Sequence, residues 1–364
     1  IFEMAVESLD RADIILLYRT GEAFWSELDA RFAELSRKKP LVCLASDPSL
    51  WGMSSMQVDR VSLCYDYLVY GGIGNFTNLL RYLMHVCDPS HELPPAPEPL
   101  PWQGIYHPAA EKCFTDTESF LKWYEHADRP LAGILFTRSY WTNDNCEMID
   151  ALVSNLEGLG LGCMPVFTSS MSDQPENRQK EHAPEKPNPV DMFFFDQHGN
   201  PILQALIKMT LLYTTPESLD NAEHKSYAES RARIFSRLNV PVFQPVISSY
   251  KTESEWKDDP HGLGSLTSWY VTLPEFEGVI EPIILAAASR SGDAGNEYRV
   301  QKPVEERARK ISQRVKKWVD LRNKPVNERK IAFVLHNKPC ASVEATVGGA
   351  AHLDSLESVA RILQ

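Results

Sequence analysis

The stretch Leu131-Ala132-Gly133-Ile134-Leu135-Phe136-Thr137 is an apolar run of strand length. Residues 144–159 follow as a helical segment closed by Gly160, and residues 163–168 form a second apolar run. Strand, helix and strand at this spacing predict one βαβ crossover, whose two strands are parallel and buried. The predicted fold class is therefore α/β, multidomain, with Rossmann-like parallel-sheet units, as a fragment of a larger subunit.

A similar pattern precedes this crossover. Two apolar runs, at residues 13–18 and 41–45, flank a helical segment at 24–36, which predicts strand, helix and strand again. The run 61–70 then leads through Gly71-Gly72-Ile73-Gly74-Asn75 into an amphipathic helix at 76–87, in the order strand then helix. Its predicted apolar stripe consists of Leu79, Leu80, Leu83 and Met84.

Proline density marks the clearest boundary in the chain. Residues 89–101 hold Pro89, Pro94, Pro95, Pro97, Pro99 and Pro101, which disfavours helix and predicts an extended connector. Beyond it, 251–364 is expected to contain a strand at 268–273, a basic helix at 304–322 and a strand at 330–335. The predicted domains are a first α/β head unit at 1–88, the connector at 89–101, a second α/β head unit at 102–250 with a mobile excursion near 169–190, and the start of a body domain at 251–364.

Bulk properties exclude several classes of protein. The formal net charge of −12 argues against nucleic-acid binding, which needs a basic face. No apolar run approaches the ~18 residues that span a bilayer. Seven cysteines are never closer than seventeen positions, so they form no CxxC pair and indicate reduced thiols in a cytoplasmic protein. The start Ile1-Phe2-Glu3-Met4 indicates truncation and not a signal peptide.

Nucleotide and hydrolase motifs are absent from the sequence. No glycine is followed by lysine, so there is no Walker A loop, and neither GxSxG nor HExxH occurs. The glycines at 158, 160 and 162 follow a helix and precede a strand, the wrong order for a dinucleotide site, so they predict a helix end. The glycines at 71–74 have the right order for an anion site, although a glycine turn with Asn75 as N-cap explains them fully.

Candidate binding residues gather late in the chain. Glu275 and Glu277 alternate around Phe276, so an extended segment would place both carboxylates on one face, where they could accept pyrrole protons or hold a divalent cation. The alternative is a solvated loop or an ion pair with the basic run 307–317. His336 and His352 flank predicted strand ends, where α/β folds form ligand sites, whereas His107 is expected to shape a turn.

An ordered series of segments carries a family resemblance. Leu273-Pro274-Glu275-Phe276-Glu277-Gly278 is followed by the basic helix, by Glu328-Arg329-Lys330-Ile331-Ala332-Phe333-Val334-Leu335-His336-Asn337-Lys338-Pro339, and by Val347-Gly348-Gly349-Ala350-Ala351-His352-Leu353-Asp354-Ser355. Earlier, Tyr70-Gly71-Gly72 and Asn75-Phe76-Thr77-Asn78-Leu79-Leu80-Arg81 fit the same pattern. The series resembles the large subunit of the ATP-dependent tetrapyrrole metal chelatases, namely CobN-type cobaltochelatase and its magnesium-chelatase relative.

The resemblance implies a tetrapyrrole-binding large subunit that inserts cobalt, its metal substrate, into a corrin-precursor ring. ATP would be used by AAA+ ATPase partner subunits and not bound by this chain, in agreement with the missing Walker A loop. The family's His-Gly-Ser-x-x-Glu type segment does not occur here, so no catalytic residue is expected in this fragment. The substrate-binding candidates are Glu275, Glu277, His336 and His352; no cofactor-binding residue is expected, and the metal ligands are unknown.

Three alternatives remain open at this point. The chain could belong to an H-type magnesium-chelatase protein, since cobalt over magnesium is inferred only from the head region and the segment 335–339. Separately, Phe276 and Glu277 match the family's Pro-Glu-x-x-Gly loop only in part. The chain could also be a non-catalytic tetrapyrrole-binding or scaffold protein with the same head fold. A nucleotide-sugar or dinucleotide enzyme built on Rossmann units would be the third, and it predicts saturable nucleotide binding.

Overall fold

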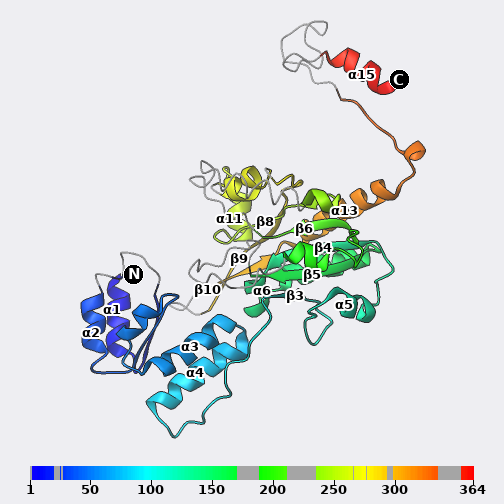
Figure 1. Cartoon of the computed structure of the whole chain (residues 1–364). Helices are drawn as coiled ribbons and strands as arrows, with labels where there is room; N and C mark the ends of the chain where they lie inside the picture. The colour runs from blue at the N-terminus through cyan, green and yellow to red at the C-terminus, as the bar shows by residue number, and fades with distance from the viewer. Residues whose placement is uncertain are drawn as a thin grey trace. The chain divides into compact units, whose positions relative to one another are not determined.

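The computed structural model of the chain is shown in Figure 1. It separates into two compact units, residues 1–316 and 317–364, which are described one at a time. The predicted boundaries at 88, 101 and 250 stay predictions. The structure describes residues 2–19, 25, 28–169, 188–210, 235–264, 266–275, 277–292, 298–334 and 354–364.

The first α/β segment is a small parallel sheet with helices. Strands β1 (Ile15–Tyr18) and β2 (Leu41–Leu44) pair in parallel, as the two apolar runs predict. Helix α1 (Phe2–Arg11) precedes β1, and α2 (Asp29–Leu35) lies between the strands in the chain. Phe32 and Leu35 of α2 belong to the same buried core as the strands because they sit one turn apart on its inner face.

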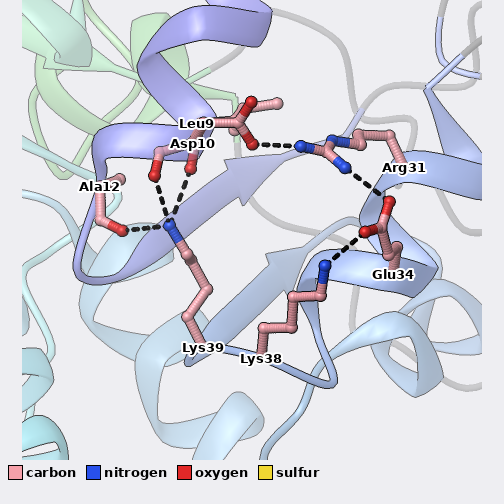
Figure 2. A network of polar contacts seen from close by, with 7 residues as sticks. All are labelled: Leu9, Asp10, Ala12, Arg31, Glu34, Lys38 and Lys39. Atoms are coloured by element: carbon pink, nitrogen blue, oxygen red, sulfur yellow. Dashed lines mark hydrogen bonds and ion pairs between the residues drawn. The ribbon is translucent and has the colours of Figure 1, made fainter.

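Charged side chains tie α1 to the segment after α2 (Figure 2). The ammonium of Lys39 donates to the carbonyls of Leu9, Asp10 and Ala12 at 3.1, 2.9 and 2.7 Å. These carbonyls lie at the end of α1, where a helix has no intrahelical donors left and carries partial negative charge. Nearby, Arg31 pairs with Asp10 and Glu34, and Glu34 with Lys38.

Two consecutive helices, α3 (Val58–Tyr70) and α4 (Ile73–Cys87), follow a 3₁₀ turn at Pro48–Met53. The prediction of a strand before Gly71 is therefore wrong, because the apolar run follows helical spacing, with Val61, Cys64 and Tyr67 buried. Two of the four residues predicted for the apolar stripe of α4 are buried. Leu79 and Leu83 are buried, whereas Leu80 and Met84 are 59% and 51% exposed, on a neighbouring face that the described residues leave uncovered.

The central element is a five-stranded sheet in the order β3-β5-β4-β6-β7. All neighbours are parallel except β3, which is antiparallel to β5. The predicted βαβ crossover is confirmed as β4, α7 and β5, and the predicted fold class with it. The elements are β3 (Gln103–Ile105), α5 (Thr117–Trp123), β4 (Leu131–Thr137), α6 (Arg138–Thr142), α7 (Glu147–Gly158), β5 (Gly162–Thr168), α8 (Pro189–Phe193), β6 (Leu203–Lys208) and β7 (Val242–Phe243).

A smaller sheet has the order β10-β9-β8. The expected strand at 268–273 is wrong: Ser268–Thr272 is a π-helical turn that continues into the short helix α12 (Leu273–Glu275). The elements of this part are β8 (Val246–Ile247), α11 (Glu253–Asp258), β9 (Ile284–Ser291) and β10 (Tyr298–Pro303).

The predicted basic helix is confirmed as α13 (Glu305–Asn323), which crosses the boundary between the two units. In the second unit, a 3₁₀ turn covers Val326–Glu328 and α15 covers Ser355–Leu363. The strand expected at 330–335 is not formed over 330–334, the part of it that is described. Across the described ranges, no helix combines the length and apolar character that crossing a membrane requires.

Candidate functional site at the carboxyl edge of the parallel sheet

The chain leaves β4 for β5 on one side and then crosses to β6 on the other side of β4. Such a reversal of strand order opens a crevice at the carboxyl ends of the strands, which is where open α/β sheets bind ligands. Three polar side chains stand at these ends: Arg138 follows β4, Lys208 ends β6 and Gln244 follows β7. Their exposed fractions are 7%, 0% and 0%.

Lys208 is the centre of a buried polar group that we call the edge cluster, made of Lys208, Thr210, Gln244 and Glu277. Its ammonium donates to the backbone carbonyl of Thr210 at 2.7 Å and to Gln244 Oε1 at 2.8 Å. It also forms an ion pair with Glu277 Oε2 at 2.8 Å, and neither side chain is more than 1% exposed. A buried charge needs this kind of compensation, because losing its hydration costs several kcal/mol.

The two predicted carboxylates do not share a face. Backbone N–H groups of Glu277 and Gly278 donate to the carbonyls of Pro274 and Glu275, and Gly278 has a φ of +77°. The segment is thus a helical turn and not a strand, so Glu275 points to solvent while Glu277 is buried.

Glu277 forms its ion pair outside the basic run 307–317, the partner that the sequence offers as an alternative. Within the basic run 307–317, Arg314 pairs with Glu281, and the guanidinium of Arg307 lies 5.5 Å from the Trp256 ring centroid. The ion pair that the structure gives Glu277 is with Lys208.

Glu277 Oε2 is held by the ion pair with Lys208. Two other atoms of the edge cluster are buried without a hydrogen-bond partner in the described part of the chain: Thr210 Oγ1 and Gln244 Nε2. Buried polar atoms of this kind usually hold an ordered water. Because the charges of Lys208 and Glu277 cancel, the cluster favours a neutral oxygen over an anion. Its chemistry is that of an anchor for the turn at 274–278.

The other end of the edge is filled by the chain itself. The guanidinium of Arg138 donates to the carbonyls of Tyr70, Leu100 and Pro101, and it lies 4.8 Å from the Trp102 ring centroid. Burial lowers the pKa of Arg138, because the guanidinium loses the water that would stabilise its charge. The place that a dinucleotide would use beside β4 is therefore occupied by residues 100–102.

Of the three histidines that the sequence singles out, the structure describes one. His336 and His352 lie outside the described residues. His107 shapes a turn, as predicted: its Nδ1 accepts from the Ala109 N–H at 3.2 Å, and its Nε2 lies 3.1 Å from Glu157 Oε1. Throughout the described ranges, no group of three or more His, Cys, Asp or Glu side chains is placed to hold a metal ion.

Sequence reasoning missed Lys208, Gln244 and Arg138. The signal for Lys208 is a charged residue that ends the apolar run Leu203-Gln204-Ala205-Leu206-Ile207. Such a residue at a strand end of a buried sheet has to find a counter-charge, and Glu277 supplies it. Nothing in the sequence indicates which of the 49 acidic residues does so.

A model of the family described as CobN/Magnesium Chelatase matches residues 65–364. The chain belongs to this family. An uncharacterised protein of Methanocaldococcus jannaschii is 35% identical over 354 residues, which are 97% of this chain and 26% of that protein. This CobN/magnesium chelatase family chain therefore spans about a quarter of the length of that relative.

Characterised relatives of the family lie further away. The aerobic cobaltochelatase subunit CobN of Pseudomonas aeruginosa is 25% identical, covering 98% of this chain and 27% of the relative. The H-type magnesium-chelatase protein of Cereibacter sphaeroides is also 25% identical, covering 83% and 25%. The catalytic subunit of cobaltochelatase from Mycobacterium tuberculosis shares the fold, with a TM-score of 0.63 over 98% of this chain and 27% of that one, at 19% identity.

Proposed function

We propose that this chain is part of the tetrapyrrole-binding large subunit of a cytoplasmic, ATP-dependent metal chelatase. The observation that carries the proposal is the family match over residues 65–364. Cobalt is the proposed metal substrate and a corrin precursor the proposed ring. In support, the cobaltochelatase relative aligns with 98% of the chain and the magnesium-chelatase relative with 83%, at equal identity.

ATP hydrolysis is assigned in this proposal to AAA+ partner subunits, since the chain has no Walker A sequence. The test is reconstitution of the whole large subunit with such partners, followed by the visible absorption of the ring with Co²⁺ or Mg²⁺. ATP-dependent insertion of Co²⁺ supports the proposal. Insertion of Mg²⁺ alone favours the magnesium-chelatase alternative, and tight ring binding without any insertion favours a scaffold protein.

Residues 1–364 by themselves are expected to bind the ring without inserting metal. Cobalt insertion by this chain in the absence of other chains would contradict that expectation.

Glu275, Glu277, His336 and His352 remain the proposed substrate-binding residues. Their surroundings divide the two carboxylates: Glu275 is exposed and available to a ligand, while Glu277 meets one only if its ion pair with Lys208 opens. We therefore assign direct contact to Glu275 and placement of the turn to Glu277. In ring titrations followed by fluorescence quenching, Glu275→Gln should weaken binding while leaving the melting temperature unchanged.

A further inference from the structure

The connector, residues 89–101, is bonded to the helices that precede it. Asn75 Nδ2 donates to the Glu98 carbonyl at 2.8 Å, and Asn75 Oδ1 accepts from the Glu98 N–H at 2.9 Å. One buried side chain thus satisfies both backbone groups of Glu98. Close by, the Tyr67 hydroxyl of α3 donates to the Pro95 carbonyl.

From the other side, Arg138 at the end of β4 holds the same segment. Its Nε donates to the Pro101 carbonyl at 2.8 Å, and one terminal nitrogen donates to the carbonyls of Leu100 at 3.3 Å and Tyr70 at 2.6 Å. Tyr70 is the last residue of α3, whose end carries partial negative charge. A single side chain therefore joins the sheet, the connector and the helix pair.

The glycines before α4 fit this arrangement. Gly72 has a φ of +88°, and a Cβ at this position would lie 2.6 Å from Leu100 Cδ1. Gly72 is also the N-cap residue of α4, whereas Asn75, the expected N-cap, lies inside the helix and binds the connector. The glycine motif thus allows close contact with Leu100, which is a packing role that needs no anion.

We propose that Arg138 makes residues 95–102 a fixed joint, which holds the α3–α4 pair to the five-stranded sheet and closes the crevice beside β4 to ligands. An isolated proline-rich segment would instead act as a semi-rigid spacer between independent units. The joint differs in that its carbonyls are bound from both sides. The role is independent of the proposed chelatase function.

Hydrogen–deuterium exchange with mass spectrometry tests the joint through the peptide 92–102. Five of its eleven residues are prolines without an amide, so the Glu98 N–H is one of only six backbone N–H groups in the peptide. Arg138→Met should accelerate exchange of this peptide about tenfold or more, because its Leu100 and Pro101 carbonyls lose a charged donor, while the β5 peptide at 162–168 stays protected. Arg129→Met is the matched control, since Arg129 donates to the Glu157 carbonyl, outside the joint.

Distances between labels give a second readout. This second readout uses spin labels at Thr77 on α4 and Glu118 on α5, both exposed, in a background in which Cys87, Cys113 and Cys340 are replaced by serine. They should give one narrow distance distribution with Arg138 present and a broad one in Arg138→Met. If Arg138→Met does not fold, Asn75→Ala removes both bonds to Glu98 and should accelerate the same peptide. The proposal is overturned if the folded variant exchanges this peptide at the same rate as the wild type. It is also overturned if the peptide 92–102 is unprotected in the wild type.

Discussion

Arg138 and Lys208 are two buried cations at the carboxyl ends of neighbouring strands, and their charges are compensated in different ways. Lys208 has a carboxylate partner, Glu277, together with a carbonyl and an amide oxygen. Arg138 bonds only to carbonyls in the described structure, as Lys39 does at the end of α1. A compact ammonium thus anchors one turn, whereas a planar guanidinium with five donors can join several backbone segments.

The largest expected effect comes from removing one member of the ion pair. Glu277→Ala leaves the ammonium of Lys208 buried without a counter-charge, so the free energy of unfolding should fall by about 3–5 kcal/mol. Urea denaturation measures it. The control is Glu275→Ala, an exposed neighbour expected to stay within about 0.5 kcal/mol of the wild type. An equal loss of unfolding free energy in the two variants would show that the ion pair contributes no more to stability than the exposed Glu275 does.

Replacing Arg138 should have the next largest effect. Arg138→Met leaves three carbonyls without their donor, which is expected to lower the free energy of unfolding by about 2–3 kcal/mol. Arg138→Lys keeps the charge but not the fork of donors, so it should recover only part of the loss. If Arg138→Lys were as stable as the wild type in urea denaturation, the positive charge at position 138 would suffice, and the geometry of the guanidinium would not matter.

Tyr67→Phe probes the joint with a smaller change. It removes the hydroxyl that donates to the Pro95 carbonyl and leaves the buried ring in place, so a loss of about 1 kcal/mol is expected. Thermal unfolding gives the difference. A loss as large as that of Arg138→Met would move the main support of the joint from the sheet side to the helix side.

In contrast to the two buried cations, Asp150 is a half-buried carboxylate whose hydrogen-bond partner is a neutral group, the Tyr106 hydroxyl at 2.9 Å. Burial raises the pKa of Asp150, and this hydrogen bond opposes the rise only in part. Its contribution to stability is therefore complete below the ordinary aspartate pKa of about 4 and is lost as the pH rises through the raised value.

Asp150→Asn keeps the acceptor and removes that pH dependence. Melting temperatures from pH 4 to pH 7 should fall less steeply for the variant, which should be slightly more stable than the wild type at pH 7. Parallel curves for the two proteins would show that Asp150 is as well compensated as Glu277.

The βαβ crossover could be predicted because its strands are buried on both faces and glycine ends its helix. The predicted run 131–137 coincides with β4, and 163–168 differs from β5 by one residue. The prediction of a strand at 61–70 was wrong because the aromatic and β-branched residues of this run favour a strand. Its helical spacing is visible only in Val61, Cys64 and Tyr67, the residues that are buried. The local sequence pattern therefore predicted an element correctly only where it fitted either a helix or a strand and not both.

The site was harder to predict because its partners are distant in the chain. Glu277 was singled out, but its burial depends on Lys208 and Gln244, which pack beside it only after β6 and β7 have joined the sheet. Arg138 gave no signal because its partners are backbone carbonyls, and every residue has one. Side-chain identity alone could not distinguish the buried Glu277 from the exposed Glu275.

The prolines of the connector impose an imbalance on its hydrogen bonding. Residues 94–101 hold five prolines, so eight carbonyls are accompanied by only three backbone N–H groups. Such a segment has many hydrogen-bond acceptors and few donors for its neighbours. Its partners, the hydroxyl of Tyr67, the amide of Asn75 and the guanidinium of Arg138, all supply donors. Any surface that packs against this segment has to be rich in N–H and O–H groups.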